Sequence, residues 1–141
     1  MKPRVFLDTN VFIYAFEFPH SNSRKIIDLL NRGAFEAIIS ESVVREVQRY
    51  FGKHYGKQLA GAFRYYLLLS CAVIPFAQIE QAMDGYRGKI KDNDLEQLTV
   101  AKELGLRFLV SLDRDFLPFE EYLTPREFLS LLGKAIPHVE Y

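Results

Sequence analysis

Short apolar runs and longer segments with helical spacing alternate along the chain. The apolar runs predict strands at 5–8, 35–39, 72–75 and 107–111. Apolar residues three or four positions apart, together with local capping signals, predict helices from residue 9, at 21–32, 40–51, 57–70, 77–86 and 93–104, and from residue 124. Alternating strands and helices with short links predict an α/β fold, with three α/β/α layers and a mainly parallel central sheet.

Capping signals mark several helix ends. Gly33 follows the segment 21–32 as a glycine stop. Asn93 and Glu96 have the spacing of a capping box, and Thr124 and Glu127 repeat that spacing around a first-turn proline. Residues 134–141 are expected to form a short C-terminal tail.

The helix predicted at 57–70 has an unusually wide apolar surface. Its main stripe is widened by Tyr65, Leu68 and Leu69. A face broader than one stripe favours burial against another surface. We therefore expect a homodimer or a higher homo-oligomer.

The composition is that of an ordinary globular protein. The chain has 141 residues, of which 49% are hydrophobic and 26% charged, and this length is typical of one domain, expected to span 1–141. Its single cysteine, Cys71, excludes an intrachain disulfide and fits a reducing compartment. No apolar run reaches the roughly 20 residues of a membrane span, so a cytoplasmic protein is expected.

Charge is unevenly distributed although the formal net charge is +0. Residues 47–79 contain four Lys and Arg residues but no Asp or Glu, whereas residues 92–127 contain nine acidic and four basic residues. Such a division is consistent with a charged partner. The candidates for RNA phosphate contacts are Arg45, Arg49, Lys53 and Lys57. An ordinary solvated helix face explains these four residues equally well.

Four carboxylates are expected to meet at one edge of the sheet. In "VFLDTNVFIYA" Asp8 closes the first strand, and Asp113 follows the strand that ends near residue 111. Glu46 and Asp94 lie near the beginnings of two helices. Helices begin where the preceding strands end, and ligands of open parallel sheets bind at that edge. Each acid alone would also serve as a helix cap, a turn residue or a surface charge.

A hard divalent cation would relieve the repulsion among four such carboxylates. Mg²⁺ and Mn²⁺ prefer carboxylate and water ligands, whereas the three histidines and Cys71 are too scattered for a zinc site. One or two ions would activate water and stabilise a leaving oxygen in phosphodiester hydrolysis. The chain has neither a Walker A loop nor a G-x-G-x-x-G motif, which argues against nucleotide-binding folds.

Five segments in this order resemble the PIN-domain nucleases, especially the VapC-type toxin ribonucleases. They are "VFLDTNVFIYA", "SESVVREVQRY", "DNDLEQLTVAKELG", "FLVSLDRDF" and "YLTPREFLSLL". The resemblance implies a metal site made by Asp8, Glu46, Asp94 and Asp113. Supporting roles fall to Thr9, Asn10, Ser111 and, as an accessory acid, Asp115. Asp92 lies so close to Asp94 that its own role stays open.

The resemblance further implies a Mg²⁺- or Mn²⁺-dependent endoribonuclease that cleaves single-stranded or looped RNA. It also implies a toxin that is held inactive by a small antitoxin. One alternative is a PIN-like module that binds RNA but has little or no catalytic activity. A metal-dependent phosphatase is a weaker alternative, because such enzymes commonly place a second aspartate two positions after the first, where this chain has Asn10.

Overall fold

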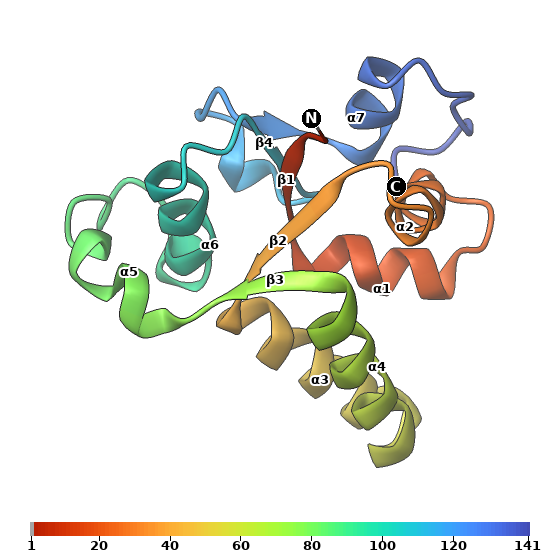
Figure 1. Ribbon diagram of the computed structural model, residues 1–141, viewed down its shortest axis with the longest axis horizontal. Coiled ribbons are helices and arrows are strands. Elements are labelled where there is room, and N and C mark those ends of the chain that lie inside the picture. Colours follow the sequence, from red (N-terminus) through yellow and green to blue (C-terminus); the bar gives the residue numbers. More distant parts are fainter. Residues whose placement is uncertain (1) are drawn as a thin grey trace.

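A five-stranded sheet forms the centre of the computed structural model, which describes residues 2–141 (Figure 1). The strands are β1 (Arg4–Leu7), β2 (Glu36–Ser40), β3 (Cys71–Ile74), β4 (Phe108–Val110) and β5 (Tyr122–Leu123). Their order is β3-β2-β1-β4-β5, and every neighbouring pair is parallel. The predicted α/β architecture with a mainly parallel sheet is confirmed.

The central strand β1 is buried on both faces. Val5, Phe6 and Leu7 are each 0% exposed, and Phe6 lies in register with Ile38 of β2 and Leu109 of β4. A parallel strand covered by helices on both sides needs a continuous apolar run rather than an alternating one. After the exposed Arg4, the first strand therefore has only apolar residues until it ends before Asp8.

Helices cover both faces of the sheet. They are α1 (Thr9–Glu17), α2 (Asn22–Asn31), α3 (Glu41–Tyr55), α4 (Lys57–Ser70), α5 (Phe76–Met83), α6 (Asp92–Glu103) and α7 (Pro125–Leu131). Figure 1 shows α5 and α6 on one side and α1, α2 and α7 on the other, while α3 and α4 extend away from the sheet as a hairpin. None of the helices among residues 2–141 has the length and apolar character that a bilayer crossing requires.

Most of the predicted elements are present, with differences at their ends. Helix α4 has the predicted bounds, and α7 has the predicted capping box between Thr124 and Glu127. Helix α3 continues four residues beyond Phe51, to Tyr55. The short strand β5 and a 3-10 helix at Arg114–Phe116 were not predicted, because two or three residues leave too little pattern to read.

The capping box predicted for Asn93 and Glu96 is wrong. Helix α6 begins at Asp92 after Lys91, and no side chain caps it. The Glu96 carboxylate instead accepts a hydrogen bond of 3.0 Å from the main-chain N–H of Ser42. This N–H lies in the first turn of α3, where main-chain donors have no partner within the helix. Packing of α6 against α3 therefore determines the direction of Glu96.

The α3–α4 hairpin is held together by aromatic side chains. The rings of Phe51 and Phe63 stack with their centroids 3.9 Å apart, and Phe51 is 0% exposed. On the outer surface of α4, Tyr65, Leu68 and Leu69 are exposed. The expected wide apolar face of this helix is therefore open to solvent.

Residues 134–141 contain no helix or strand but lie against the α1–α2 connection. The ring of Tyr141 lies 4.6 Å from Phe18 and 5.1 Å from Tyr14, measured between centroids. The main-chain N–H of Ser23 donates a hydrogen bond of 2.8 Å to the main-chain oxygen of Tyr141. The predicted tail thus covers the start of α2.

Candidate active site

The predicted acids lie at the carboxyl edge of the sheet, near the point where strand order reverses. From β1 the chain adds β2 and β3 on one side, and then β4 and β5 on the other. Asp8 follows β1 directly, and Ser111 and Asp113 follow its neighbour β4. Such a reversal leaves a crevice beyond the strand ends, because the two connections leave the sheet in opposite directions.

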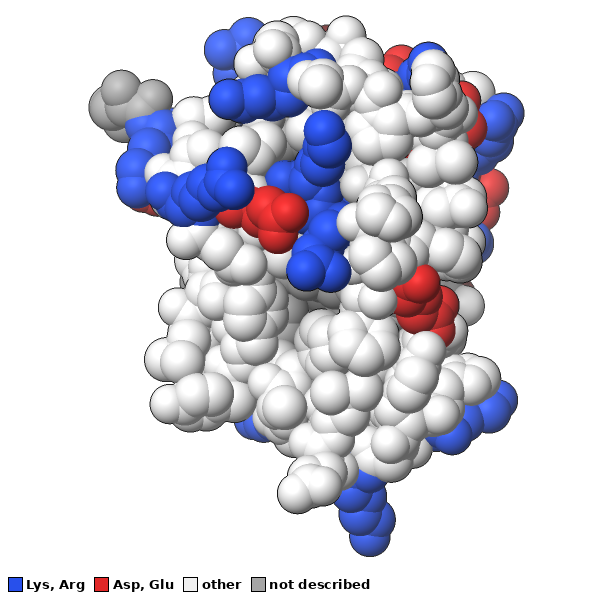
Figure 2. Space-filling view, turned by 90° about the vertical axis from the view of Figure 1, so that its right-hand side faces the viewer, with Lys and Arg blue, Asp and Glu red and all other residues white. Residues whose placement is uncertain are grey.

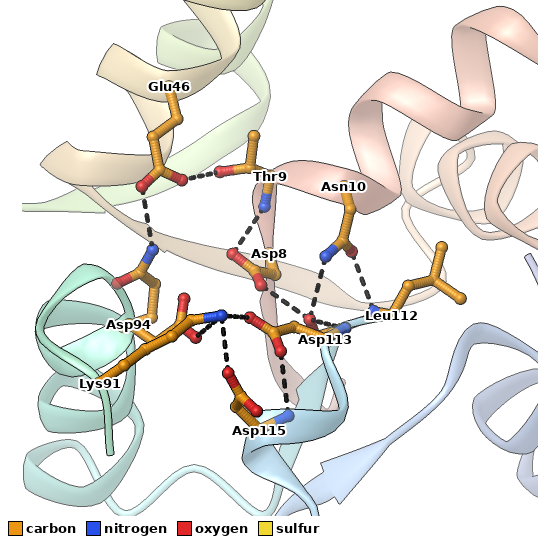
Figure 3. Close-up of polar contacts among 11 residues, drawn as sticks. Asp8, Thr9, Asn10, Glu46, Lys91, Asp94, Leu112, Asp113 and Asp115 are labelled. Carbon is orange, nitrogen blue, oxygen red and sulfur yellow. Dashed lines mark hydrogen bonds and ion pairs between the residues drawn. The ribbon is translucent and has the colours of Figure 1, made fainter.

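Asp8 is at the centre of this edge and is only 4% exposed (Figure 3). Its Oδ1 accepts a hydrogen bond of 2.8 Å from the Thr9 N–H, and its Oδ2 accepts one of 2.7 Å from the Ser111 hydroxyl. Burial raises the pKa of Asp8 to about 6, although these two hydrogen bonds lower it. The charges of Glu46 and Asp113 raise it further.

Asn10 connects the start of α1 to the segment after β4. Its Nδ2 donates a hydrogen bond of 3.2 Å to Ser111 Oγ, and its Oδ1 accepts one of 3.0 Å from the Leu112 N–H. Ser111 Oγ also accepts a hydrogen bond of 2.9 Å from the Asp113 N–H. Asn10 and Ser111 thus fix the positions of Asp8 and Asp113 relative to each other, in line with the predicted support by hydrogen bonds.

Glu46 reaches the site from the second turn of α3. The Thr9 hydroxyl donates a hydrogen bond of 2.5 Å to Oε1 of Glu46 (Figure 3). Gln97 Nε2 lies 3.5 Å from Oε2 of Glu46. Gln97 was not identified from the sequence. It lies three positions after Asp94, so one turn of α6 brings both side chains to the same side of that helix. This spacing is the only sequence signal for Gln97.

Three aspartates form the densest acidic group. Among residues 2–141, Asp94, Asp113 and Asp115 are the acids that offer three oxygens within 4.8 Å of one another. The ammonium of Lys91, which precedes α6, lies between them at 3.3, 2.9 and 2.7 Å from these residues in that order. Lys91 was also missed in the sequence, where it is an unremarkable surface residue type.

Within this group, the pKa values of Asp94 and Asp113 are shifted in opposite directions. Burial, followed by the adjacent Asp113 carboxylate, raises the pKa of Asp94 to about 8. Burial also acts to raise the pKa of Asp113, but its contacts with Asp94, Lys91 and the Asp115 N–H lower it overall. The pair therefore holds a proton more readily at Asp94, which is the behaviour of neighbouring carboxylates that share one site.

The other predicted residues lie around this centre. Asp92 is exposed and lies outside the acidic group, whereas Asp94 is buried. Arg45 lies 3.9 Å from Glu96, and Arg49, Lys53 and Lys57 are exposed, with no carboxylate within 4.0 Å among the described residues. Arg45, Arg49 and Lys53 follow one another at four-residue intervals along α3 and therefore form a row that leads away from Glu46.

The donor set fits a hard divalent cation. The buried Oδ2 of Asp94 accepts no hydrogen bond from any of the described residues, although the Lys91 ammonium is near it. Burying a carboxylate oxygen without a hydrogen-bond partner is costly. Oxygen ligands that come mainly from carboxylates are the set that Mg²⁺ or Mn²⁺ prefers.

Three of the solved structures with the same fold are a toxin and two toxin–antitoxin complexes. A toxin–antitoxin complex from Klebsiella pneumoniae matches with a TM-score of 0.68 and 22% identity, over 87% of this chain and 98% of that chain. VapC20 of Mycobacterium tuberculosis, described as a sarcin–ricin loop cleaving toxin, matches with a TM-score of 0.63 and 17% identity, over 81% and 93%. DNA-bound VapBC from Salmonella typhimurium matches with a TM-score of 0.63 and 18% identity, over 89% and 99%.

The family is established by the sequence itself. No curated protein matches the chain significantly by sequence. The sequence model of the PIN domain, however, matches residues 5–121, which include every predicted site acid from Asp8 to Asp115. Four of the five segments that indicated the resemblance lie within this match, and the fifth, at 122–132, lies beyond it. The chain belongs to the PIN domain family.

Proposed function

We propose that this protein is a divalent-metal-dependent endoribonuclease that cleaves single-stranded or looped RNA. What supports this activity is the meeting of Asp8, Glu46, Asp94 and Asp113 at one edge of the sheet, within a PIN-family fold. A bound Mg²⁺ or Mn²⁺ would supply Lewis-acid activation of water and of the phosphodiester. Whether the centre holds one ion or two, these four acids are the proposed ligands and Asp115 is an accessory acid.

The chain's own residues would fix the geometry of that centre. Ser111 and Asn10 hold Asp8 and the Asp113 main chain in place by hydrogen bonds. Thr9 and Gln97 do the same for Glu46. Preorganised ligands reduce the reorganisation needed when metal and RNA bind.

The row of cations on α3, together with Lys57 at the start of α4, would carry the RNA backbone toward the acids. Arg49, Lys53 and Lys57 are exposed, and no described carboxylate pairs with them. Phosphate contacts of this kind position a nucleic acid without reading its sequence. An RNA substrate agrees with the activity stated for the Mycobacterium tuberculosis protein of the same fold.

The test is cleavage of an end-labelled, unstructured RNA with Mn²⁺, with Mg²⁺ and with EDTA. We expect metal-dependent cleavage by the wild type and at least about 100-fold slower cleavage by Asp8→Asn, because metal catalysis is worth several kcal/mol. Asp92→Asn is the matched control, since it removes one exposed carboxylate from the beginning of α6. It should cleave like the wild type.

Equal cleavage by the wild type and Asp8→Asn would reveal a contaminating nuclease and remove support for the mechanism. RNA retention without cleavage in either metal would favour the catalytically inactive RNA-binding module. Hydrolysis of small phosphate monoesters in place of RNA would favour a phosphatase.

A groove between α1, α2 and α4 would receive an antitoxin. It has a volume of about 420 Å³ and its lining is mostly apolar, including Phe12, Phe16, Ile27, Leu59, Phe63 and Tyr66. Figure 2 shows that this side of the molecule carries basic residues in its upper part and a broad area almost without charge below them. An amphipathic segment of a small partner is the ligand that such a groove fits.

Co-expression with the product of an adjacent small gene tests this partner. The wild type should co-purify with it, and Ile27→Glu, which places a charge in the groove, should not. Leu131→Glu introduces the same change on α7 outside the groove, where Leu131 is 58% exposed, and should leave the complex intact. Loss of the complex in both variants would argue against the groove.

The exposed face of α4 is the proposed homodimer surface. Tyr65 and Leu69 are 67% and 69% exposed, and Leu68 lies beside them. Light scattering should find a dimer for the wild type and a monomer for Leu69→Glu. A wild type that remains monomeric at high concentration would contradict this assembly.

A further inference from the structure

Lys91 lies where the acidic group is most concentrated. Its Nζ is 2.7 Å from Asp115, 2.9 Å from Asp113 and 3.3 Å from Asp94 (Figure 3). The other lysine in the described chain with a carboxylate within 4.0 Å is Lys102, which pairs with Glu121 alone. A lysine that contacts three carboxylates at once is therefore specific to this site.

The position of the ammonium conflicts with the proposed metal. Asp94, Asp113 and Asp115 are the same residues whose oxygens lie within 4.8 Å of one another and would offer ligands to a cation. Mg²⁺ binds oxygen at about 2.0–2.1 Å, so an ion ligated by these oxygens would occupy the space that the ammonium fills. Two cations a few ångströms apart also repel each other strongly where water is partly excluded.

The exposure of Lys91 allows its ammonium to move away from the three carboxylates. Lys91 lies just before α6, and its side chain is 48% exposed, whereas that of Asp94 is 9% exposed. The lysine side chain is long and flexible and its ammonium is well hydrated in water. Rotation about its side-chain bonds would therefore move the charge into solvent without changing the helix.

We propose that Lys91 is an internal cation that competes with the divalent metal for the Asp94, Asp113 and Asp115 carboxylates. In the metal-free protein it compensates their charge, and it lowers the affinity of the site for metal. Only a sufficient concentration of divalent cation then displaces it and completes the centre. This role rests on the proposed metal-dependent function of the same acids.

Calorimetric titration with Mn²⁺ tests the competition without any RNA. Lys91→Gln should bind Mn²⁺ at least about tenfold more tightly than the wild type, because no ammonium has to be displaced. Lys89→Gln is the matched control. It removes the same charge two positions away, from an exposed lysine that has no described carboxylate within 4.0 Å. A general effect of net charge would appear equally in both variants.

Thermal unfolding supplies a second readout. In EDTA, Lys91→Gln should unfold at a lower temperature than the wild type and Lys89→Gln, because three neighbouring carboxylates lose their counter-ion. Saturating Mn²⁺ should remove this difference. Unchanged or weaker Mn²⁺ binding by Lys91→Gln would overturn the proposal.

The two proposals fail in different ways. If all three proteins bind Mn²⁺ equally and the wild type cleaves RNA, the competition is wrong but the nuclease remains. If none of them binds Mn²⁺, the metal-dependent nuclease is wrong, and the competition is wrong with it.

Discussion

The two ends of α3 have opposite physical characters. Near its beginning, the Ser42 N–H donates a hydrogen bond to the Glu96 carboxylate, and the Glu46 carboxylate accepts one from the Thr9 hydroxyl. Near its end, Phe51 and Tyr55 join an aromatic cluster with Phe16 and Phe63. One helix thus connects a region of polar contacts to a cluster of aromatic rings packed around the buried Phe51.

Burial has opposite effects on the stability of the fold at the two ends of α3. It removes the carboxylates near Glu46 from water, which disfavours their charged form and raises the pKa of Asp8 and of Asp94. At the aromatic end, burial removes apolar surface from water and stabilises the fold. The aromatic end therefore offsets a cost that the buried carboxylates impose.

The largest expected effect on stability is at the aromatic end. Phe51→Ala should lower the free energy of unfolding by about 3–5 kcal/mol, because it leaves a cavity beside a stacked ring. Leu131→Ala is the control on α7, where Leu131 is 58% exposed, and it should change stability by less than about 0.5 kcal/mol. Urea unfolding measures both. Equal losses would show that the ring cluster has no special role.

At the polar end, a substitution is expected to raise the free energy of unfolding rather than lower it. The pKa of Asp8 is raised from 3.8 to about 6, so its burial is unfavourable once it is ionised. The raised pKa of Asp8 contributes to the free energy of unfolding. This contribution is fully present below pH 4 and is lost as the pH rises through about 6. In EDTA at pH 8, Asp8→Asn should therefore be more stable than the wild type, by up to about 3 kcal/mol. Urea unfolding at pH 4 and pH 8 checks this, and a destabilised variant at pH 8 would contradict it.

The smallest expected effect concerns the pH dependence of metal binding. Metal ligands must be deprotonated, and the raised pKa values of Asp8 and Asp94 mean that protons compete with the ion. Between pH 5 and pH 6, the dissociation constant for Mn²⁺ should fall by about tenfold for each proton released, or about 1.4 kcal/mol. Titrations in buffers of different ionisation enthalpy count those protons. A constant affinity would mean that the ligands are already ionised at pH 5.

The elements of the fold were predictable where burial leaves a clear pattern. The run from Val5 to Leu7 is apolar because both faces of β1 are covered. The end of α3 was placed too early, at Phe51, which is the last residue of its apolar face; Gly52 follows, and glycine weakens a helix. In the structure, an added Cβ at Gly52 would lie 3.7 Å from Ala60, so packing against α4 continues the helix through this position.

The candidate site was predictable from its acids but not from its neighbours. The acids could be located because each follows a strand or lies in the first two turns of a helix at the same sheet edge. Lys91 and Gln97 depend instead on the rotation of α6 about its own axis. All residues from Asp94 to Ala101 are buried, so this helix has no polar face whose spacing would reveal that rotation.

The hydrogen bond between Asp8 and Ser111 joins residues that are 103 positions apart. During synthesis from the N-terminus, Asp8 leaves the ribosome long before its partner has been made. At about 5–20 residues per second, the ribosome needs several seconds to add the intervening chain. An unfinished chain therefore has β1 and α1 but no acidic centre. The proposed nuclease centre is therefore complete only after β4 has emerged from the ribosome and paired with β1.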